Sequence, residues 1–227
     1  RDSHDKGLTW SDPIPTTMVG DWETDLYRPG CHNHVYGFTK LQDGTLLAVF
    51  LHQHDDQYKN VANMGDGTWG GEICQPYCSR SEDGGLSWQT PVPMDNAAYN
   101  SDGKPQGPHG GWSETTLSQI PFGATRGVPG RIVASCRPYR SPHGWQTHSD
   151  DGGRTWRQVC NTSFAVHNGP QLVATQSGYL TMIGPLGGVR LHTSVDGGVN
   201  WDAGTLISDH GWYNGFLLEV EPDVILT

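Results

Sequence analysis

The sequence has few basic residues and no long hydrophobic run, and both deficits exclude classes of protein. No apolar stretch approaches the ~18 residues that a membrane-spanning helix needs. There are 14 Lys and Arg against 24 Asp and Glu, and the net charge of −10 argues against nucleic acid or an anionic membrane surface as a partner. The net charge does not argue against an anionic small ligand, because a few arginines can dominate the charge of one pocket.

Amphipathic helix patterns and metal-ligand patterns are also missing. Five cysteines leave at least one thiol unpaired within the chain. His52, His54, Cys74 and Cys78 match no zinc-ligand spacing, so we expect no metal and no cofactor. The chain is instead rich in glycine (31), proline (15), tryptophan (9) and tyrosine (8), which is typical of many short strands joined by tight turns. We therefore expect an all-β fold.

One pattern, Ser-x-Asp-x-Gly-x-x-Trp, occurs four times, tens of residues apart. Its copies begin at Ser3, Ser81, Ser149 and Ser194. Ser and Asp side chains can bond the amides of a turn, Gly accepts a positive φ, and the Trp would anchor the turn on the apolar side. Four copies indicate a repeat architecture in which each turn marks one larger unit. We interpret these residues as fold markers and not as catalytic groups.

The stretches between the turns repeat as well. Residues 35–50, with Asp43-Gly44 in the middle, have the pattern of strand, turn and strand, and residues 171–183 and 216–226 repeat it. Each unit is then strand, hairpin, strand, loop, strand, Ser-Asp turn, strand, which is a four-stranded propeller blade. We expect blades at about residues 31–93, 111–160 and 167–207. Residues 10–15 would be the last strand of an earlier blade, and residues 212–227 the first strands of a later one.

The four turns resemble the Asp-box repeats of the sialidase superfamily. The resemblance implies a β-propeller of four-stranded blades, six in the family norm, of which residues 1–227 would cover about four as a single domain that starts and ends in mid-blade. In that family the Asp box lies away from the active site, so function has to be argued from other residues.

The inner strand of each blade opens beside the central channel of a propeller. Here the opening residues are all polar: His34, Glu114, Asn168 and Asn214. The second strands return to the same face, where Asp55 and Asp56 follow one blade and Arg137 and Tyr139 close the next. Carboxylates, a phenol and guanidinium groups on short loops make a candidate active site, and a merely hydrated channel is the alternative.

The resemblance assigns roles to these residues. Trp112-Ser113-Glu114, followed by a hairpin that ends at Arg137, resembles the family's stretch in which a Glu precedes a carboxylate-binding arginine. Tyr213 resembles the nucleophilic tyrosine, Arg28 the opening arginine, and Asp55 or Asp56 the acid/base aspartate. This implies retaining hydrolysis of a terminal sialic acid or related acidic sugar: Glu114 takes the proton of Tyr213, and the phenolate attacks the anomeric carbon.

The sequence departs from the family at the third arginine. Gly184 to Gly188 occupy its place, and Arg190 is the nearest substitute. Two other hypotheses therefore stay open. One is a sialidase-fold enzyme for another polysaccharide, acidic or neutral, in which His34 or His54 takes part in the acid/base catalysis. The other is a noncatalytic carbohydrate-binding propeller with an aromatic rim that includes Trp112. In all three the partner is a glycan, bound by Arg28, Arg137, Arg190, His34, Asn168 and Trp112.

Overall fold

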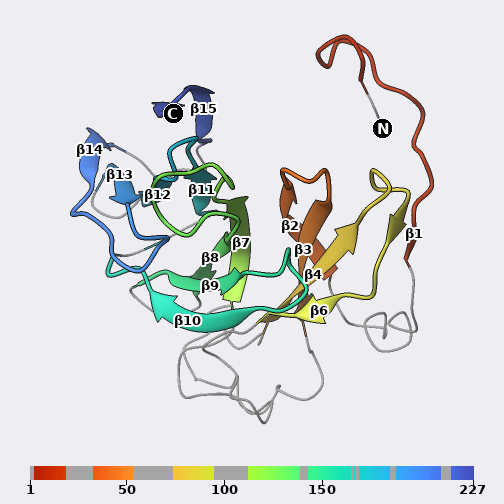
Figure 1. The fold of residues 1–227 in the computed structure, drawn as a ribbon, viewed down its shortest axis with the longest axis horizontal. Helices are drawn as coiled ribbons and strands as arrows, with labels where there is room; N and C mark the ends of the chain where they lie inside the picture. The colour runs from red at the N-terminus through yellow and green to blue at the C-terminus, as the bar shows by residue number, and fades with distance from the viewer. Residues whose placement is uncertain are drawn as a thin grey trace.

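The fold is all β in the computed structural model, which describes residues 3–18, 33–53, 74–94, 112–138, 143–164, 166, 169–184, 188–210 and 216–227. In these ranges there is no helix, and hence none that could cross a membrane. The strands form four-stranded antiparallel sheets that follow one another in chain order like the blades of a propeller (Figure 1). The predicted fold class is confirmed.

Each sheet runs from the inner to the outer strand in sequence order. Blade 1 consists of β2 (Asn33–Lys40), β3 (Leu46–Gln53), β4 (Cys74–Ser81) and β6 (Val92–Pro93). Blade 2 consists of β7 (Trp112–Gln119), β8 (Ile132–Pro138), β9 (Trp145–Ser149) and β10 (Arg157–Asn161). Blade 3 consists of β11 (Gln171–Ala174), β12 (Leu180–Gly184), β13 (Val189–Ser194) and β14 (Thr205–Ser208). The hairpin β15 (Leu218–Glu221) and β16 (Val224–Leu226) follows. All these strands lie where the repeats predicted them.

The N-terminal segment differs from the prediction. The strand expected over residues 10–15 is wrong: the described chain is extended there without sheet pairing. Pro13 and Pro15 carry no N–H, so they cannot donate to a ladder. A short strand, β1 (Thr17–Met18), forms just after them and pairs in parallel with β5 (Ser87–Trp88).

The four Ser-Asp turns share one set of hydrogen bonds. In the turn of blade 1, the Ser81 hydroxyl donates to Asp83 (2.8 Å) and accepts from the amide of Gly85 (2.8 Å), and the amide of Ser87 donates to Asp83 (2.9 Å). The same bonds recur in the turns that start at Ser3, Ser149 and Ser194. The repeated sequence therefore encodes a repeated local geometry.

The tryptophans of these turns are not equivalent. Trp156 is buried, as expected of an anchor, and Trp201 packs on the core between blades 2 and 3. Trp10 is 60% exposed, so the anchor predicted for the first turn is wrong. Its indole N–H donates to the carbonyl of Gly7 within its own turn. No described sheet lies beside that turn to cover the ring.

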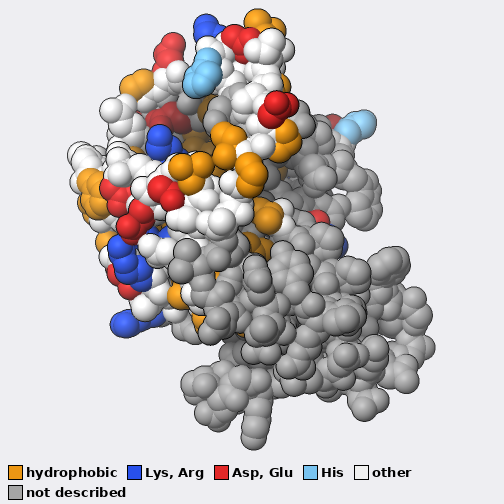
Figure 2. All heavy atoms as spheres, turned by 90° about the vertical axis from the view of Figure 1, so that its right-hand side faces the viewer, with side chains coloured by type: hydrophobic (Ala, Val, Ile, Leu, Met, Phe, Trp, Pro, Cys, Tyr) orange, Lys and Arg blue, Asp and Glu red, His pale blue; other side chains and the backbone are white. Residues whose placement is uncertain are grey.

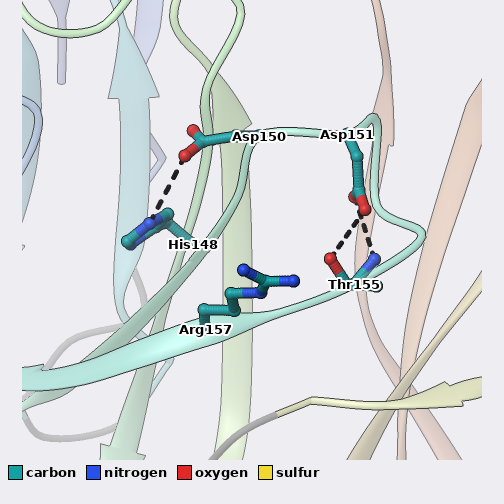
Figure 3. Close-up of a pocket in the computed structure, with 5 residues that line it drawn as sticks. All are labelled: His148, Asp150, Asp151, Thr155 and Arg157. Atoms are coloured by element: carbon teal, nitrogen blue, oxygen red, sulfur yellow. Dashed lines mark hydrogen bonds and ion pairs between the residues drawn. The ribbon is translucent and has the colours of Figure 1, made fainter.

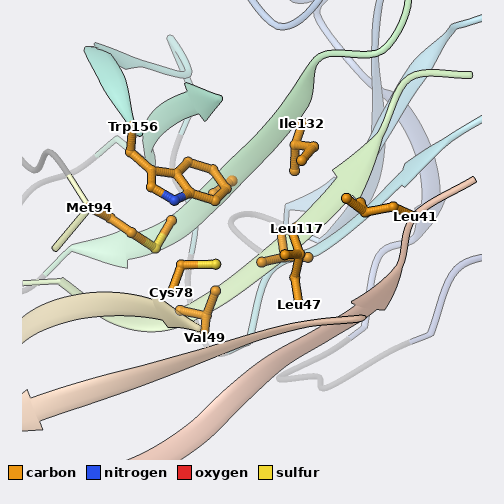
Figure 4. Packing of buried hydrophobic residues seen from close by; sticks show 9 residues of the cluster. Leu41, Leu47, Val49, Cys78, Met94, Leu117, Ile132 and Trp156 are labelled. Carbon is orange, nitrogen blue, oxygen red and sulfur yellow. The ribbon is translucent and has the colours of Figure 1, made fainter. Parts of the chain in front are cut away.

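The core lies between neighbouring blades. One cluster joins blades 1 and 2, and Figure 4 shows its side chains converging from both sheets: Leu41, Leu47, Val49, Cys78, Met94, Leu117, Ile132, Ala134 and Trp156. A second cluster, built around Ile120, Leu180 and Met182, joins blades 2 and 3. Burial of such side chains is the main stabilising contribution and fixes each blade against the next.

The inner hairpins are also linked at their tips. The amide of Phe122 donates to Gln42 (2.7 Å), and the amide of Gln42 donates to Gln119 (2.8 Å). The amide of Arg126 donates to the carbonyl of Ser177 (3.0 Å). The Ser177 hydroxyl in turn donates to Asp223 (2.6 Å), in the turn between β15 and β16. These hydrogen bonds, called the tip contacts below, connect all successive hairpins at one end of the blades.

The surface is a mixture of apolar and charged side chains. On the side shown in Figure 2, a group of apolar side chains lies near the middle of the described surface, with acidic and basic side chains around it. Large apolar residues that remain exposed include Val35 and Phe38 on β2, Phe216 just before β15, and Leu218 at the start of β15.

Candidate functional site

The described part of the predicted site centres on Glu114 and Arg137. Glu114 is near the start of β7, and Arg137 is near the end of β8, so antiparallel pairing brings both to the end of blade 2 that is opposite the tip contacts. Nη1 of Arg137 lies 3.3 Å from Oε2 of Glu114, and both side chains are half-buried. The sequence predicted that Glu114 and Arg137 lie at the same face of the propeller, and the geometry of this pair agrees with that prediction.

A β-bulge aims Glu114 at this end. Trp112 pairs with Pro138 and Thr115 with Cys136, so Ser113 and Glu114 together face the single residue Arg137. An extra residue in one strand bends that strand and redirects its side chains, and bulges occur often beside active sites. The repeat pattern gave no signal for this irregularity.

The second partner of Glu114 is a backbone amide from the segment that enters the next blade. The N–H of Gly169 donates to Oε2 of Glu114 at 2.6 Å. Oε1 accepts no hydrogen bond from the residues that the structure describes. The carboxylate is therefore fixed through one oxygen, and the other is available to a ligand or to a neighbouring group. Sequence reasoning missed Gly169, because a backbone donor leaves no trace in side-chain chemistry.

Blade 1 brings the start of its inner strand close to the same place. A Cβ on Gly37 would lie 2.8 Å from the carbonyl oxygen of Thr115, so glycine allows β2 and β7 to approach closely. His34 precedes Gly37 on β2 and pairs with Leu51. By this register His34 lies at the same end of its strand as Glu114 does on β7.

Arg190 has a different environment. It lies on β13, opposite Gly184, and its Nη1 donates to the carbonyl of Gly204 at 2.8 Å, just before the outer strand β14. The guanidinium is thus engaged toward the outer part of blade 3. In this arrangement Arg190 makes no contact with Glu114 or Arg137, and a substrate-binding role would require it to exchange this partner.

The remaining predicted residues lie outside the described residues: Arg28, Asp55, Asp56, Tyr139, Asn168, Tyr213 and Asn214. Trp112 is described only as the first residue of β7. Gly169, which contacts Glu114, directly follows Asn168 in the chain. Within the described ranges no group of three or more His, Cys, Asp or Glu could hold a metal ion.

The fold has known counterparts among solved structures. The Hadza microbial sialidase Hz136 superposes with a TM-score of 0.64 at 18% identity, over 98% of this chain and 39% of that one. A protein of unknown function from Dyadobacter fermentans superposes with a TM-score of 0.54 at 22% identity, over 80% of this chain and 52% of that one. The α-L-arabinanase of Penicillium chrysogenum superposes with a TM-score of 0.52 at 13% identity, over 88% of this chain and 52% of that one.

These comparisons establish a shared propeller fold. No family model and no curated protein matches the chain. The chain spans between two fifths and about half the length of these three structures. Propellers with this arrangement of strands thus include glycoside hydrolases that act on different sugars, so the choice of chemistry depends on the residues of the site.

Proposed function

We propose that this chain forms part of a sialidase-fold glycoside hydrolase that removes a terminal acidic sugar, sialic acid or a relative, with retention of configuration. The observation that carries the proposal is the Glu114 carboxylate, which lies at a bulge at the end of blade 2 opposite the tip contacts and which Arg137 and the Gly169 amide hold in place. A fixed carboxylate beside a guanidinium is the arrangement that a base and an anion-binding group need.

In the proposed mechanism Glu114 acts as the base for Tyr213. A phenol ionises near pH 10, so it is a weak nucleophile at neutral pH unless a base removes its proton. Oε1 of Glu114 is the oxygen for this task, because Oε2 already accepts from Arg137 and Gly169. The phenolate attacks the anomeric carbon, and the glycosidic oxygen leaves with a proton from Asp55 or Asp56.

The arginines complete the proposal. Arg137, with Arg28, would bind the sugar carboxylate, and His34, Asn168 and Trp112 would contact the rest of the ring. A tyrosine suits such a substrate because it stays neutral until Glu114 takes its proton, whereas an ionised carboxylate nucleophile would be repelled throughout by the carboxylate that the sugar carries at the same carbon.

A second candidate keeps the fold and changes the substrate. Arg190 donates to Gly204 and is directed away from the Glu114 pair, which leaves fewer arginines for a carboxylate. This favours an enzyme for another polysaccharide, in which His34 assists in proton transfer. A noncatalytic glycan-binding propeller is the third possibility, and loss of Glu114 would not abolish its binding.

The test is hydrolysis of a 4-methylumbelliferyl sialoside by the protein at its full natural length. Glu114→Gln and Tyr213→Phe should each lower kcat by about 10²-fold or more, the usual contribution of a general base. Glu221→Gln, at an exposed carboxylate on β15, is the matched control and should retain full activity.

Each other result selects between the candidates. If the intact protein cleaves the sialoside and Glu114→Gln retains full activity, Glu114 is not the base. Should the intact protein leave the sialoside uncleaved but release a uronic or neutral sugar from its aryl glycoside, the second candidate is correct. Binding of glycans without any cleavage would support the third.

A further inference from the structure

A small hollow lies beside the Ser-Asp turn of blade 2. Its volume is about 200 Å³, and it is lined by His148, Asp150, Asp151, Thr155 and Arg157 (Figure 3). Typical pockets for drug-sized ligands measure about 300–1,000 Å³, so this one is suited to a smaller molecule, of the size of a single sugar ring. Most of its lining residues are exposed, so a ligand can reach it from solvent.

The hollow is separate from the Glu114 site. His148 pairs with Val133 near the start of β8, whereas Arg137 is near the end of that strand. At ~3.4 Å per residue the two sites are about 14 Å apart along β8, at opposite ends of blade 2. A ligand here therefore does not touch Glu114.

The two carboxylates of the hollow are already held by protein donors. Arg131 binds Asp150 through two hydrogen bonds of 2.7 and 2.8 Å. Asp151 accepts from the Ser149 hydroxyl and from both the amide and the hydroxyl of Thr155. An ionised carboxylate offers about four acceptor positions, so Asp150 keeps about two for a ligand.

Arg157 supplies donors that have no partner among the described residues. Its guanidinium projects from β10 into the space between the His148–Asp150 pair and the Asp151–Thr155 pair (Figure 3). It makes no hydrogen bond or ion pair with the described residues. Every other described arginine has a side-chain, carbonyl or ring partner: Arg80 and Arg154 on Glu82, Arg126 on Tyr179, Arg131 on Asp150, Arg137 on Glu114, and Arg190 on Gly204.

The formal charges of the hollow and of its bound Arg131 cancel near neutral pH. Arg131 and Arg157 are positive, and Asp150 and Asp151 are negative. Burial, together with the charge of Arg131, lowers the pKa of His148 below its usual value, while Asp150 opposes this shift. His148 is therefore neutral at pH 7, and the hollow offers donors and acceptors side by side without a net charge.

We propose that this hollow binds one neutral sugar ring through adjacent hydroxyl groups. The Arg157 guanidinium would donate to the hydroxyl oxygens, and Asp150 would accept hydrogen bonds from the same hydroxyl groups at its remaining acceptor positions. An anionic sugar fits less well, because the two aspartates offset the attraction of Arg157 and Arg131 for its charge, and because Asp150 would face a carboxylate that has no proton to donate. This is a binding site without chemistry, and it does not depend on the proposed hydrolase activity.

The experiment is a titration of ¹⁵N-labelled protein at pH 7.5, followed by NMR. D-galactose and D-glucose are the neutral probes, and D-galacturonate and D-glucuronate are their anionic counterparts. We expect saturable shifts of the amides of residues 151–155 with at least one neutral sugar, and an affinity at least about threefold lower for its uronate. Arg157→Gln should remove the shifts.

Two variants serve as controls. Arg154→Gln changes another exposed arginine of the same turn that does not line the hollow, and it should leave the shifts intact. Glu114→Gln should also leave them intact, which separates this site from the proposed catalytic one. The proposal is overturned if no neutral sugar gives saturable shifts, if Arg157→Gln leaves them unchanged, or if the uronate binds more tightly than the sugar.

Discussion

The amide of Gly169 donates a 2.6 Å hydrogen bond to Oε2 of Glu114, although 55 residues separate them in the chain. This bond ties the inner strand of blade 2 to the segment that enters blade 3. It also leaves the second carboxylate oxygen of Glu114 without a described partner. The same contact therefore has a structural role, in joining blades, and a chemical one, in orienting a carboxylate.

Replacing Glu114 should separate these two roles. Glu114→Ala leaves the Gly169 amide without its acceptor, so we expect the free energy of unfolding to fall by about 1–3 kcal/mol. Glu114→Gln keeps an acceptor oxygen and should cost less than about 1 kcal/mol. Urea denaturation measures both. Equal losses for the two variants would show that the negative charge, and not the acceptor, holds this contact.

Two glycines in equivalent hairpin turns provide a matched pair. Gly44 and Gly178 both have φ of +91°, which an L side chain rarely adopts. A Cβ on Gly44 would meet nothing within 4 Å, whereas on Gly178 it would lie 2.4 Å from the carbonyl oxygen of Arg126. We expect Gly44→Ala to lower the free energy of unfolding by about 1–2 kcal/mol, because the positive φ alone is strained for alanine.

Gly178→Ala should cost about 1–3 kcal/mol more than Gly44→Ala, because the tip contact between Arg126 and Ser177 has to move as well. Thermal or urea unfolding of the two variants gives the difference directly. Similar losses for both would mean that the loop of residues 121–130 shifts freely to accommodate the methyl group.

The Ser-Asp turns should make stability depend on pH in the acid range. Hydrogen bonds from the hydroxyl and amide of Ser87 hold the pKa of Asp83 at about 2, below the usual 3.8, and the pKa of Asp5 is also about 2. A lowered pKa in the folded state stabilises the protein above the unfolded value, and this contribution is lost as the pH falls from about 4 to about 2.

Asp83→Asn should therefore weaken the fall in stability between pH 4 and pH 2, measured by urea denaturation at a series of pH values. Ser87→Ala removes the hydroxyl donor and should weaken it less. An Asp83→Asn protein with the same pH dependence as the wild type would contradict the role of this carboxylate.

The described cysteines should differ in reactivity. Burial raises the pKa of Cys78 to about 12, and Cys136 is also buried. Burial and the charge of Asp196 raise the pKa of Cys160 too, but this residue is exposed, so a reagent can reach it. Because the thiolate is the reactive form, iodoacetamide at pH 8 should modify Cys160 in the native protein, and Cys78 and Cys136 only after unfolding. Peptide mass spectrometry locates the label. Early modification of Cys78 would indicate that the interface between blades 1 and 2 opens readily.

The strands were predictable because their signals are local. Asp43-Gly44 and Ser177-Gly178 each lie between apolar runs, and each forms the turn of an inner hairpin, β2–β3 and β11–β12. The Ser-Asp turns were predictable for the same reason, since the hydrogen bonds that the four turns share join residues at most four positions apart. The sequence thus predicts the strands of the three four-stranded sheets and of the terminal hairpin.

What the sequence did not predict depends on contacts between distant segments. The pairing of β1 with β5, the bulge at Glu114 and the amide of Gly169 all involve partners that no local pattern specifies. The exposure of Trp10 was not predicted for the same reason, because the tryptophan of a turn is buried only where a sheet lies beside that turn. For the site, the family resemblance paired Glu114 with Arg137, and Arg28, Asp55, Asp56 and Tyr213 remain predictions.

The tip contacts have a consequence for how the molecule can vary. They fix the spacing of the blades at the end remote from Glu114, where the inner hairpins of neighbouring blades bond to one another. An insertion into those turns would uncouple adjacent blades. Loops at the Glu114 end can change in length and sequence while the tip contacts keep the blades in register. We therefore expect the two ends of the same sheets to differ in mutational tolerance.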